Sequence, residues 1–259
     1  MATTGTEGRL SGFRIDSKVA LVTGGASGIG FAAASLLSEA GARVFILDRD
    51  GAAAEEAARK IGASACRLDI TDEAAILQVF GGIDGAAGGI DILVNNAGTA
   101  IRRPAVEQTL EEWNRVLAVN MTGAFLAART AARHMLARGR GGAIVATASI
   151  MGLSGGGLYP NISYQATKGA MVNMTRALAV EWAKDNIRVN AVAPTYVRTP
   201  FIAPLLAQPE LVAAIERMTP LGRLAEPEEV AAAILFLASP AASMITGHTL
   251  PVDGGFLAQ

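Results

Sequence analysis

The sequence predicts a single-domain α/β protein with a Rossmann fold, in which a doubly wound, seven-stranded parallel sheet carries helices on both faces. Short apolar runs rich in β-branched residues alternate with alanine-rich helical stretches along the chain. Each run is apolar on both sides, which is typical of strands covered by helices on both faces. Strand–helix alternation requires right-handed crossovers and therefore a parallel sheet. A length of 259 residues fits one large domain better than two.

The alternation places seven strands and at least five helices. The strands are predicted over Val19–Thr23, Arg43–Asp48, Ser64–Leu68, Ile90–Asn95, Ala143–Thr147, Arg188–Val192 and His248–Val252. The helices are predicted over Ile29–Ala40, Ala52–Ile61, Thr109–Arg138, Tyr164–Lys184 and Glu228–Leu237.

No repeat, charge block or linker divides the chain, so we expect one dinucleotide-binding and catalytic domain over 18–259. Residues 1–17 are predicted to form an N-terminal tail, because the first residues are polar and rich in glycine and threonine, without the basic and apolar pattern of a signal peptide. The stretch Pro194–Pro220 breaks the alternation and is rich in proline and apolar residues. We expect a substrate lid there, over about 195–220.

Composition excludes several classes of function. Twenty-two basic against 23 acidic side chains leave a net charge of −1, which offers no attraction to nucleic acid or anionic lipid. The longest apolar stretch, Val230–Ala238, is far too short to span a bilayer. The single cysteine, Cys66, cannot form an internal disulfide, so we expect a cytoplasmic protein in which Cys66 is a small buried hydrophobe. No metal site is predicted.

A glycine-rich loop follows the first predicted strand and leads directly into a helix. Glycine is needed where the backbone turns sharply or approaches a pyrophosphate, and the helix N-terminus presents free N–H groups to the phosphates. The strand before the loop and the helix after it supply the context that a glycine cluster alone lacks. The predicted cofactor contacts in this loop are Gly24, Ser27, Gly28, Ile29 and Gly30.

The second part of the dinucleotide signature is Asp48, at the end of the second strand. It lies 18 residues after Gly30, close to the ~20 expected for the acid that binds the adenosine ribose. A carboxylate there accepts hydrogen bonds from the ribose hydroxyls and repels a 2′-phosphate, which favours NAD. No basic residue replaces Ala26 or Ser27 to offset that repulsion, although Arg49 leaves some use of NADP open.

Further cofactor contacts are expected at the ends of the next two strands. Asp69, with Ile70 after it, follows the third strand, where it would either rest against the adenine or cap the helix that begins near Asp72. Asn96, Ala97 and Gly98 end the fourth strand in the same way.

Tyr164 and Lys168 are the predicted acid/base pair. At positions i and i+4 near a helix start they share one face. Tyrosine, with a reference pKa near ~10, is a poor base at neutral pH, and a nearby ammonium together with a positive nicotinamide ring lowers that pKa. Lysine can also hydrogen-bond the nicotinamide ribose. Spacing alone leaves open a snorkelling pair at the surface.

Two polar residues strengthen this interpretation. Ser149 follows the fifth strand, and doubly wound folds place their sites at the C-terminal ends of strands. Asn120 interrupts the long predicted helix, where an amide indicates a solvent-facing residue, a kink or a site that holds water.

Taken together, these motifs resemble the short-chain dehydrogenase/reductase family. The resemblance runs in collinear order from about Lys18 to the C-terminus, and it includes Pro194–Thr199 and the terminal Val252-Asp253-Gly254-Gly255. It implies that Tyr164 is the catalytic acid/base and that Lys168 lowers its pKa while holding the ribose.

The resemblance also assigns roles to the other polar residues. Ser149 would hydrogen-bond the substrate oxygen, and Asn120 would fix a water that relays protons from Lys168. Beside Pro194, the backbone of Val197 and the hydroxyl of Thr199 would hold the nicotinamide carboxamide. Members of the family usually assemble as homotetramers through two long helices and the C-terminal segment.

Two positions depart from the family pattern. The family's serine most often precedes the tyrosine by thirteen positions, which falls here on Met151, whereas Ser149 lies 15 positions before Tyr164. We therefore infer two extra residues in the loop Leu153–Ile162, a length that resembles polyol and sugar-acid dehydrogenases. Thr195 stands where a glycine usually follows the proline, and it adds bulk and a hydroxyl beside the nicotinamide.

The sequence thus predicts an NAD(H)-dependent oxidoreductase that interconverts a small secondary alcohol and its ketone. The predicted substrate-binding residues are Ser149, Met151, Leu153, Tyr159, Thr195 and Phe201. An NADH-dependent 3-oxoacyl or steroid-type reductase is the alternative, because an apolar lid suits a larger substrate; the lid residues are Phe201, Ile202, Leu205 and Leu206. A non-catalytic NAD sensor has no need of the complete catalytic set, and a related epimerase or dehydratase would need a further C-terminal domain.

Overall fold

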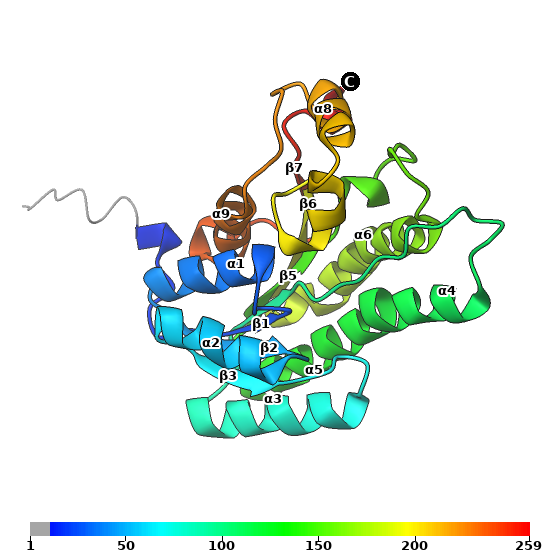
Figure 1. The fold of residues 1–259 in the computed structure, drawn as a ribbon. Helices are drawn as coiled ribbons and strands as arrows, with labels where there is room; N and C mark the ends of the chain where they lie inside the picture. Colours follow the sequence, from blue (N-terminus) through cyan, green and yellow to red (C-terminus); the bar gives the residue numbers. More distant parts are fainter. Residues whose placement is uncertain (1–10) are drawn as a thin grey trace, which may run out of the picture.

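The computed structural model describes residues 11–259, which form one seven-stranded, entirely parallel sheet between two layers of helices (Figure 1). The strands are β1 (Val19–Thr23), β2 (Arg43–Asp48), β3 (Ser64–Arg67), β4 (Ile92–Asn95), β5 (Gly142–Thr147), β6 (Ile187–Pro194) and β7 (Thr249–Val252). The helices are α1 (Gly28–Glu39), α2 (Gly51–Ile61), α3 (Glu73–Ala87), α4 (Leu110–Leu117), α5 (Ala124–Arg138), α6 (Ile162–Trp182), α7 (Ala203–Leu206), α8 (Pro209–Met218) and α9 (Pro227–Ala238).

The strand order is β3-β2-β1-β4-β5-β6-β7, which confirms the predicted Rossmann fold. The chain winds outward from β1 in one direction to β3 and then returns to add β4 on the other side of β1. In doubly wound sheets the ligand crevice lies beside such a reversal, at the carboxyl ends of the strands. The topology therefore places the site between the loops that follow β1 and β4.

The core consists of one apolar layer on each face of the sheet. One layer packs α1, α2 and α9 against strand residues such as Val22 and Ile46. The other packs α3, α5 and α6 against Leu21 and Leu93 from the same strands. Because successive residues of a strand point to opposite faces, strands apolar throughout can serve both layers.

The helix α3, of which the sequence indicated only the beginning, covers 15 residues. The side chain of Asp72 caps it by accepting a hydrogen bond from the backbone N–H of Ala75 at 3.0 Å. Its second half contains three glycines, which lower intrinsic helix stability by about 1 kcal/mol each. Burial of Ile76, Phe80 and Ile83 on one face compensates for them.

The long helix predicted over Thr109–Arg138 consists of three consecutive pieces. Thr109 and Glu112 form a capping box at the start of α4. Residues Ala118–Gly123 then form a π-helix, and α5 continues to Arg138. π-Turns inside helices are rare and often mark functional sites, and this one contains the buried Asn120.

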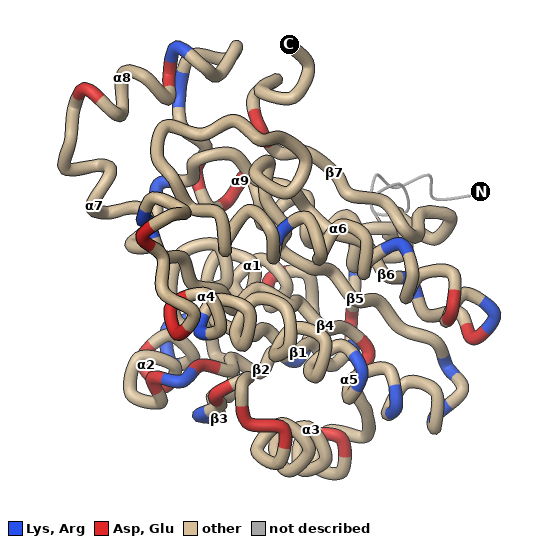
Figure 2. Tube along the Cα trace, turned by 90° about the vertical axis from the view of Figure 1, so that its right-hand side faces the viewer, with Lys and Arg blue, Asp and Glu red and all other residues tan. Residues whose placement is uncertain are grey.

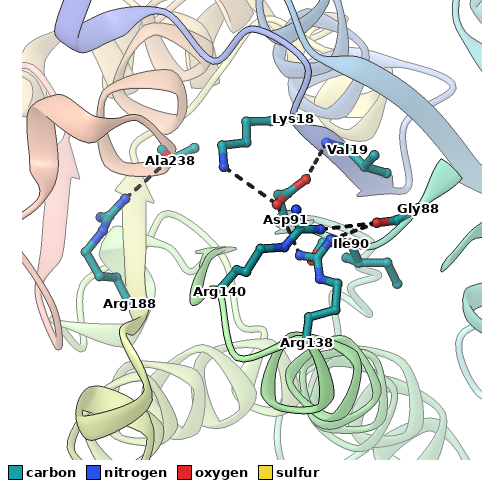
Figure 3. Close-up of polar contacts among 9 residues, drawn as sticks. All are labelled: Lys18, Val19, Gly88, Ile90, Asp91, Arg138, Arg140, Arg188 and Ala238. Carbon is teal, nitrogen blue, oxygen red and sulfur yellow. Dashed lines mark hydrogen bonds and ion pairs between the residues drawn. The ribbon is translucent and has the colours of Figure 1, made fainter.

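Asp91 joins several elements at the opposite, N-terminal edge of the sheet (Figure 3). Its carboxylate accepts a hydrogen bond from the backbone N–H of Val19 at 2.9 Å and one from Arg138 at 3.1 Å, and Lys18 lies 3.7 Å away. Arg138 also donates to the carbonyl of Ile90 at 2.5 Å. These contacts fasten the end of α5 to the beginnings of β1 and β4.

The N-terminal tail and the substrate lid were both predicted from the sequence. Of the predicted tail 1–17, residues 1–10 lie outside the described residues, and Ile15 is buried in the core against α1. Within the predicted lid, residues 195–220 form a short 3₁₀ turn, α7 and α8 above the carboxyl edge of the sheet (Figure 1).

Acidic and basic residues are interspersed over helix ends and loops, and no single-sign stripe is visible along the chain in Figure 2. Over residues 11–259, no helix combines the length and apolar character that crossing a membrane requires.

Candidate active site

A cleft of about 620 Å³ opens at the carboxyl edge of the sheet, where the segments after β1, β2, β3, β4, β5 and β6 converge. Most of the predicted site residues line it. They are Gly24, Ser27, Gly28, Ile29, Asp48, Asp69, Ile70, Asn96, Ala97, Gly98, Ser149, Met151, Tyr159, Tyr164, Lys168, Pro194, Thr195, Val197, Thr199 and Phe201. Gly30, Asn120 and Leu153 do not line it.

The glycine loop after β1 has the shape that a pyrophosphate requires. Gly24 and Gly28 adopt positive φ angles of 62° and 54°, which residues with a Cβ rarely adopt. A Cβ on Gly30 would clash with the carbonyl of Gly24 and lie 2.6 Å from the amide nitrogen of Asn96. Gly30 thus lets α1 approach the loop, while Ser27 leaves the first N–H groups of α1 uncapped by its side chain. The cradle fits a dinucleotide phosphate.

Asp48 lies at the end of the cleft beside this loop. Its carboxylate accepts hydrogen bonds from the backbone N–H groups of Ala26 at 3.3 Å and Asp50 at 3.1 Å, which fix its orientation. Arg49 also lines the cleft. The predicted acid is therefore in place at the end of β2, with one cation next to it.

Asp69 does not cap a helix, because Asp72 occupies the cap of α3. Asp69 instead accepts hydrogen bonds from the backbone N–H and the hydroxyl of Thr71, at 2.9 and 2.8 Å, and these bonds lower the pKa of its carboxyl. Since Asp69 and the buried Ile70 line the cleft, contact with the adenine remains the prediction for this position.

Asn96 connects three strand ends beneath the cleft. Its side-chain amide donates to the carbonyls of Gly24 at 3.1 Å and Thr23 at 3.3 Å, and its oxygen accepts from the hydroxyl of Thr147 at 3.1 Å. The loops after β1, β4 and β5 are thereby held in one fixed arrangement.

Lys168 is buried and not a snorkelling surface residue, as spacing alone had allowed. It is 3% exposed, and its ammonium donates to the carbonyl of Thr147 at 2.5 Å and lies 5.5 Å from the centre of the Tyr164 ring. Burial lowers the pKa of Lys168 to about 8. The pair therefore shares one face of α6, directed into the cleft.

The pKa of Tyr164 in the protein alone differs from the expectation. Burial raises it to about 12, because removing the phenolate from water outweighs the hydrogen bond with Ser149 and the charge of Arg102, which both lower it. The predicted lowering combined the lysine with a positive nicotinamide ring. The residues of the chain by themselves thus keep Tyr164 a protonated phenol at neutral pH.

Asn120 lies in the π-helix and is completely buried, so it is not a solvent-facing residue. Its amide exchanges hydrogen bonds with the backbone of Thr99, both at 2.8 Å, and donates to the hydroxyl of Thr167 at 3.1 Å. The position that a Cβ of Gly98 would occupy lies 3.5 Å from the Asn120 oxygen and 3.9 Å from the Lys168 nitrogen. Glycine there keeps a side chain out of the space between these groups, where the water stays a prediction.

Ser149 begins the irregular segment that connects β5 to α6. Its hydroxyl accepts a hydrogen bond from the backbone N–H of Met151 at 3.1 Å and also bonds Tyr164. The longer serine–tyrosine spacing therefore still brings both groups together, as inferred.

Only one of the two side chains proposed for the wall of this loop reaches the cleft. Tyr159 lines the cleft, whereas Leu153 is 38% exposed and does not line it, so substrate binding by Leu153 stays a prediction. Leu153 follows a 3₁₀ turn over Ile150–Gly152, which directs it toward solvent. None of the three glycines at 155–157 takes a positive φ, so the loop does not depend on glycine-only backbone angles.

The end of β6 supplies the far wall of the cleft. Thr195 is buried, and its hydroxyl has no hydrogen-bond partner within the described part of the chain. Thr199 donates to the carbonyl of Val197 at 3.2 Å. Phe201 is half-exposed and its ring lies 6.1 Å from that of Tyr164.

The lid is less apolar toward the cleft than the sequence indicated. Ile202 lines the cleft, but Leu205 and Leu206 do not. Both leucines pack in an apolar cluster that also contains Ile202, and this packing stabilises the lid.

Several polar residues of the cleft were missed by the sequence reasoning, and three of them lie toward its substrate end. Arg102 lies in the irregular segment after β4, Asn161 directly precedes α6, and Tyr196 follows Thr195. No motif spacing singles them out, because only the folding of three separate loops brings them together.

Comparison with known proteins identifies the family. Residues 24–257 match the family model described as enoyl-(acyl carrier protein) reductase. The chain is 45% identical to galactitol 2-dehydrogenase (L-tagatose-forming) of Cereibacter sphaeroides over 247 residues, which cover 94% of this chain and 96% of that protein.

Solved structures agree with this assignment. A short-chain type dehydrogenase/reductase from Mycobacterium marinum superposes with a TM-score of 0.93 at 38% identity, covering 96% of this chain and 99% of the other. A gluconate 5-dehydrogenase from Burkholderia cenocepacia, solved with NADP and tartrate, has a TM-score of 0.92 at 34% identity, with coverages of 97% and 99%. The chain belongs to the short-chain dehydrogenase/reductase family, in its polyol dehydrogenase branch, and is a nicotinamide-nucleotide-dependent oxidoreductase that interconverts secondary alcohols and ketones.

Proposed function

We propose that this enzyme oxidises a secondary hydroxyl of a small polyhydroxylated substrate with NAD⁺, and reduces the corresponding ketone with NADH. The observation that carries the proposal is the convergence of Tyr164, Ser149 and Lys168 on one side of a cleft whose other end holds the glycine loop and Asp48. Such a cleft accommodates a dinucleotide and a small alcohol end to end.

The residues divide the proton chemistry among them. Tyr164 exchanges the hydroxyl proton of the substrate, and Ser149, bonded to it, holds the same oxygen and stabilises charge that develops there. Lys168, with a pKa of about 8, is mostly protonated at neutral pH and supplies the positive charge that favours the phenolate. A bound nicotinamide accepts or supplies the hydride. Room between Asn120, Gly98 and Lys168 provides a path for the proton toward solvent.

We propose a preference for NAD over NADP on the basis of Asp48. Its carboxylate faces the end of the cleft where the adenosine ribose would lie, and it would repel a 2′-phosphate there. The relative from Burkholderia cenocepacia was solved with NADP, so a 2′-phosphate is accepted by at least one similar protein. In this chain Arg49 is the cation beside the site that would limit the preference.

A homotetramer, a cytoplasmic location and a mobile lid over about 195–220 complete the proposal. Exposed apolar side chains support assembly through α5 and α6: Phe125 and Leu136 lie on α5, and Val180, which is 81% exposed, lies on α6. The single cysteine supports a reducing compartment.

The test is a screen for NAD⁺ reduction at mildly alkaline pH over polyols, hydroxy acids, simple secondary alcohols and steroids. We expect turnover with polyhydroxylated compounds, and we expect Tyr164→Phe to keep its dissociation constant for NADH while kcat falls by at least about a hundredfold. A Tyr164→Phe enzyme that retained most of its kcat would refute the role of Tyr164.

A further inference from the structure

Arg102 is fixed at the substrate end of the cleft by two aromatic rings. Its guanidinium carbon lies 5.1 Å from the centre of the Tyr159 ring and 5.7 Å from the centre of the Phe201 ring. It also donates to the backbone carbonyl of Phe201 at 3.4 Å. These contacts come from the loop before α6 and from the lid, so the cation is held by segments that are far apart in the chain.

The positive charge of Arg102 has no carboxylate partner anywhere in residues 11–259. Its Nε is buried without an acceptor. The neighbouring Arg103 differs on every point, because it is exposed, lies outside the cleft and pairs with Glu112 at 3.0 Å. A partly buried cation that the chain leaves unpaired is unfavourable unless a ligand supplies the counter-ion.

The position of Arg102 relative to the reacting oxygen is set by Phe201. The Phe201 ring contacts Arg102 on one side and lies 6.1 Å from the Tyr164 ring on the other. A substrate whose hydroxyl meets Tyr164 would therefore extend toward Arg102 along its carbon chain. A group some carbons away from the oxidised carbon would reach the guanidinium.

Asn161 supplies a second donor at the same end of the cleft. It is 3% exposed, and its oxygen accepts a hydrogen bond from Gln165 at 2.7 Å. Asn161 lines the cleft, so its side-chain amide can offer a donor to a bound ligand. Arg102 and Asn161 thus provide donors at this end of the cleft that acceptor oxygens of a ligand would satisfy.

We propose that Arg102 binds a carboxylate of the substrate, so that the enzyme acts on a polyhydroxylated acid in preference to a neutral polyol. The proposal rests on the proposed function, since it concerns the same site. The planar guanidinium can form two parallel hydrogen bonds with a carboxylate, which a neutral hydroxyl cannot match. Arg102 is then a specificity-determining residue at a distance from the hydride transfer.

The experiment compares six-carbon aldonates with the alditols of the same configuration, in wild type, Arg102→Gln, Arg102→Lys and the control Arg103→Gln. We expect wild type to favour the aldonates in kcat/KM by at least about tenfold. Arg102→Gln should lose about tenfold to a hundredfold more for aldonates than for alditols, mainly through KM, because any effect of the lost charge on Tyr164 is common to both substrates. Arg102→Lys should recover part of the loss, and Arg103→Gln should behave as wild type.

A second measurement separates this proposal from the proposed function. Calorimetric titration of an aldonate into the enzyme loaded with NADH should show binding in wild type and at least tenfold weaker binding in Arg102→Gln, with NADH affinity unchanged as the check on folding. If wild type oxidised no secondary alcohol, the proposed function would fail while this titration still decided the role of Arg102. Equal kcat/KM values for alditols and aldonates in wild type, with equal losses for both in Arg102→Gln, would overturn the proposal. Arg102 would then only stabilise the contact between the loop before α6 and the lid.

Discussion

Replacing Lys168 by methionine is expected to stabilise the protein at neutral pH while removing its activity. Methionine matches the length of lysine but carries no charge to desolvate. The wild-type ammonium is 3% exposed and has one hydrogen-bond acceptor, the carbonyl of Thr147. The function of Lys168 therefore requires a charge in a place where the fold disfavours one.

The magnitude follows from the pKa of Lys168. Its fall from 10.5 to about 8 corresponds to roughly 3 kcal/mol of unfavourable burial at neutral pH. Lys168→Met removes this unfavourable energy but also removes the charged hydrogen bond to Thr147, which stabilises the wild type by about 2 kcal/mol. The substitution should therefore raise the free energy of unfolding by about 1 kcal/mol.

The pH dependence is the sharper part of this prediction. Because the folded pKa is below the unfolded one, the unfolded wild-type chain binds more protons between about pH 8 and pH 10.5. Wild-type stability should rise through that window relative to Lys168→Met, by about 2 kcal/mol between pH 7 and pH 9.5. At pH 9.5 the variant should therefore be less stable than wild type by about 1 kcal/mol.

Urea denaturation of both proteins at these two pH values, at one protein concentration, measures the difference. Taking the difference between the two proteins cancels the titration of all other groups. A variant more than about 1 kcal/mol less stable than wild type at pH 7 would contradict the burial argument. A gap that stayed constant with pH would do the same.

Two further predictions concern the two ends of the cleft. Asp48→Ala should narrow the preference for NAD⁺ over NADP⁺ in kcat/KM by about tenfold or more, since it removes the charge that faces a 2′-phosphate; equal use of both cofactors by wild type would show that Arg49 dominates the site. Tyr159→Ala should raise KM for the substrate severalfold with an unchanged dissociation constant for NADH, whereas Leu153→Ala, in the same loop but outside the cleft, should leave both at wild-type values. Identical kinetics for these two variants would show that the loop is only a connector.

The alternation of apolar runs predicted the inner strands because these are buried on both faces, a pattern that local sequence records directly. The edge strands β3 and β7 are only partly buried. The ends were less certain. The prediction began the fourth strand at Ile90, whereas β4 begins at Ile92, and β6 continues to Pro194 beyond the predicted end. The extent of α3 was not predicted, because its glycines oppose helix formation and only tertiary burial of Ile76 and Phe80 restores it.

Most of the proposed catalytic and cofactor residues could be placed in the cleft from the sequence, because they follow a strand end or lie in the first turns of α6. The residue proposed to select the substrate could not. Arg102 lies in an irregular segment whose path depends on Tyr159 and Phe201, both distant in sequence. Leu153 follows a 3₁₀ turn after Ser149 and does not line the cleft, and the sequence does not reveal this turn.

The contacts of Asp91 lie at the far end of the strands from the cleft (Figure 3). A substitution at this edge would change the free energy of unfolding without contacting the residues that are proposed to bind the substrate. Conversely, the loops around Arg102 can be exchanged without loosening the strands that carry them. Robustness and substrate range can therefore evolve, or be engineered, as two separate properties of one sheet.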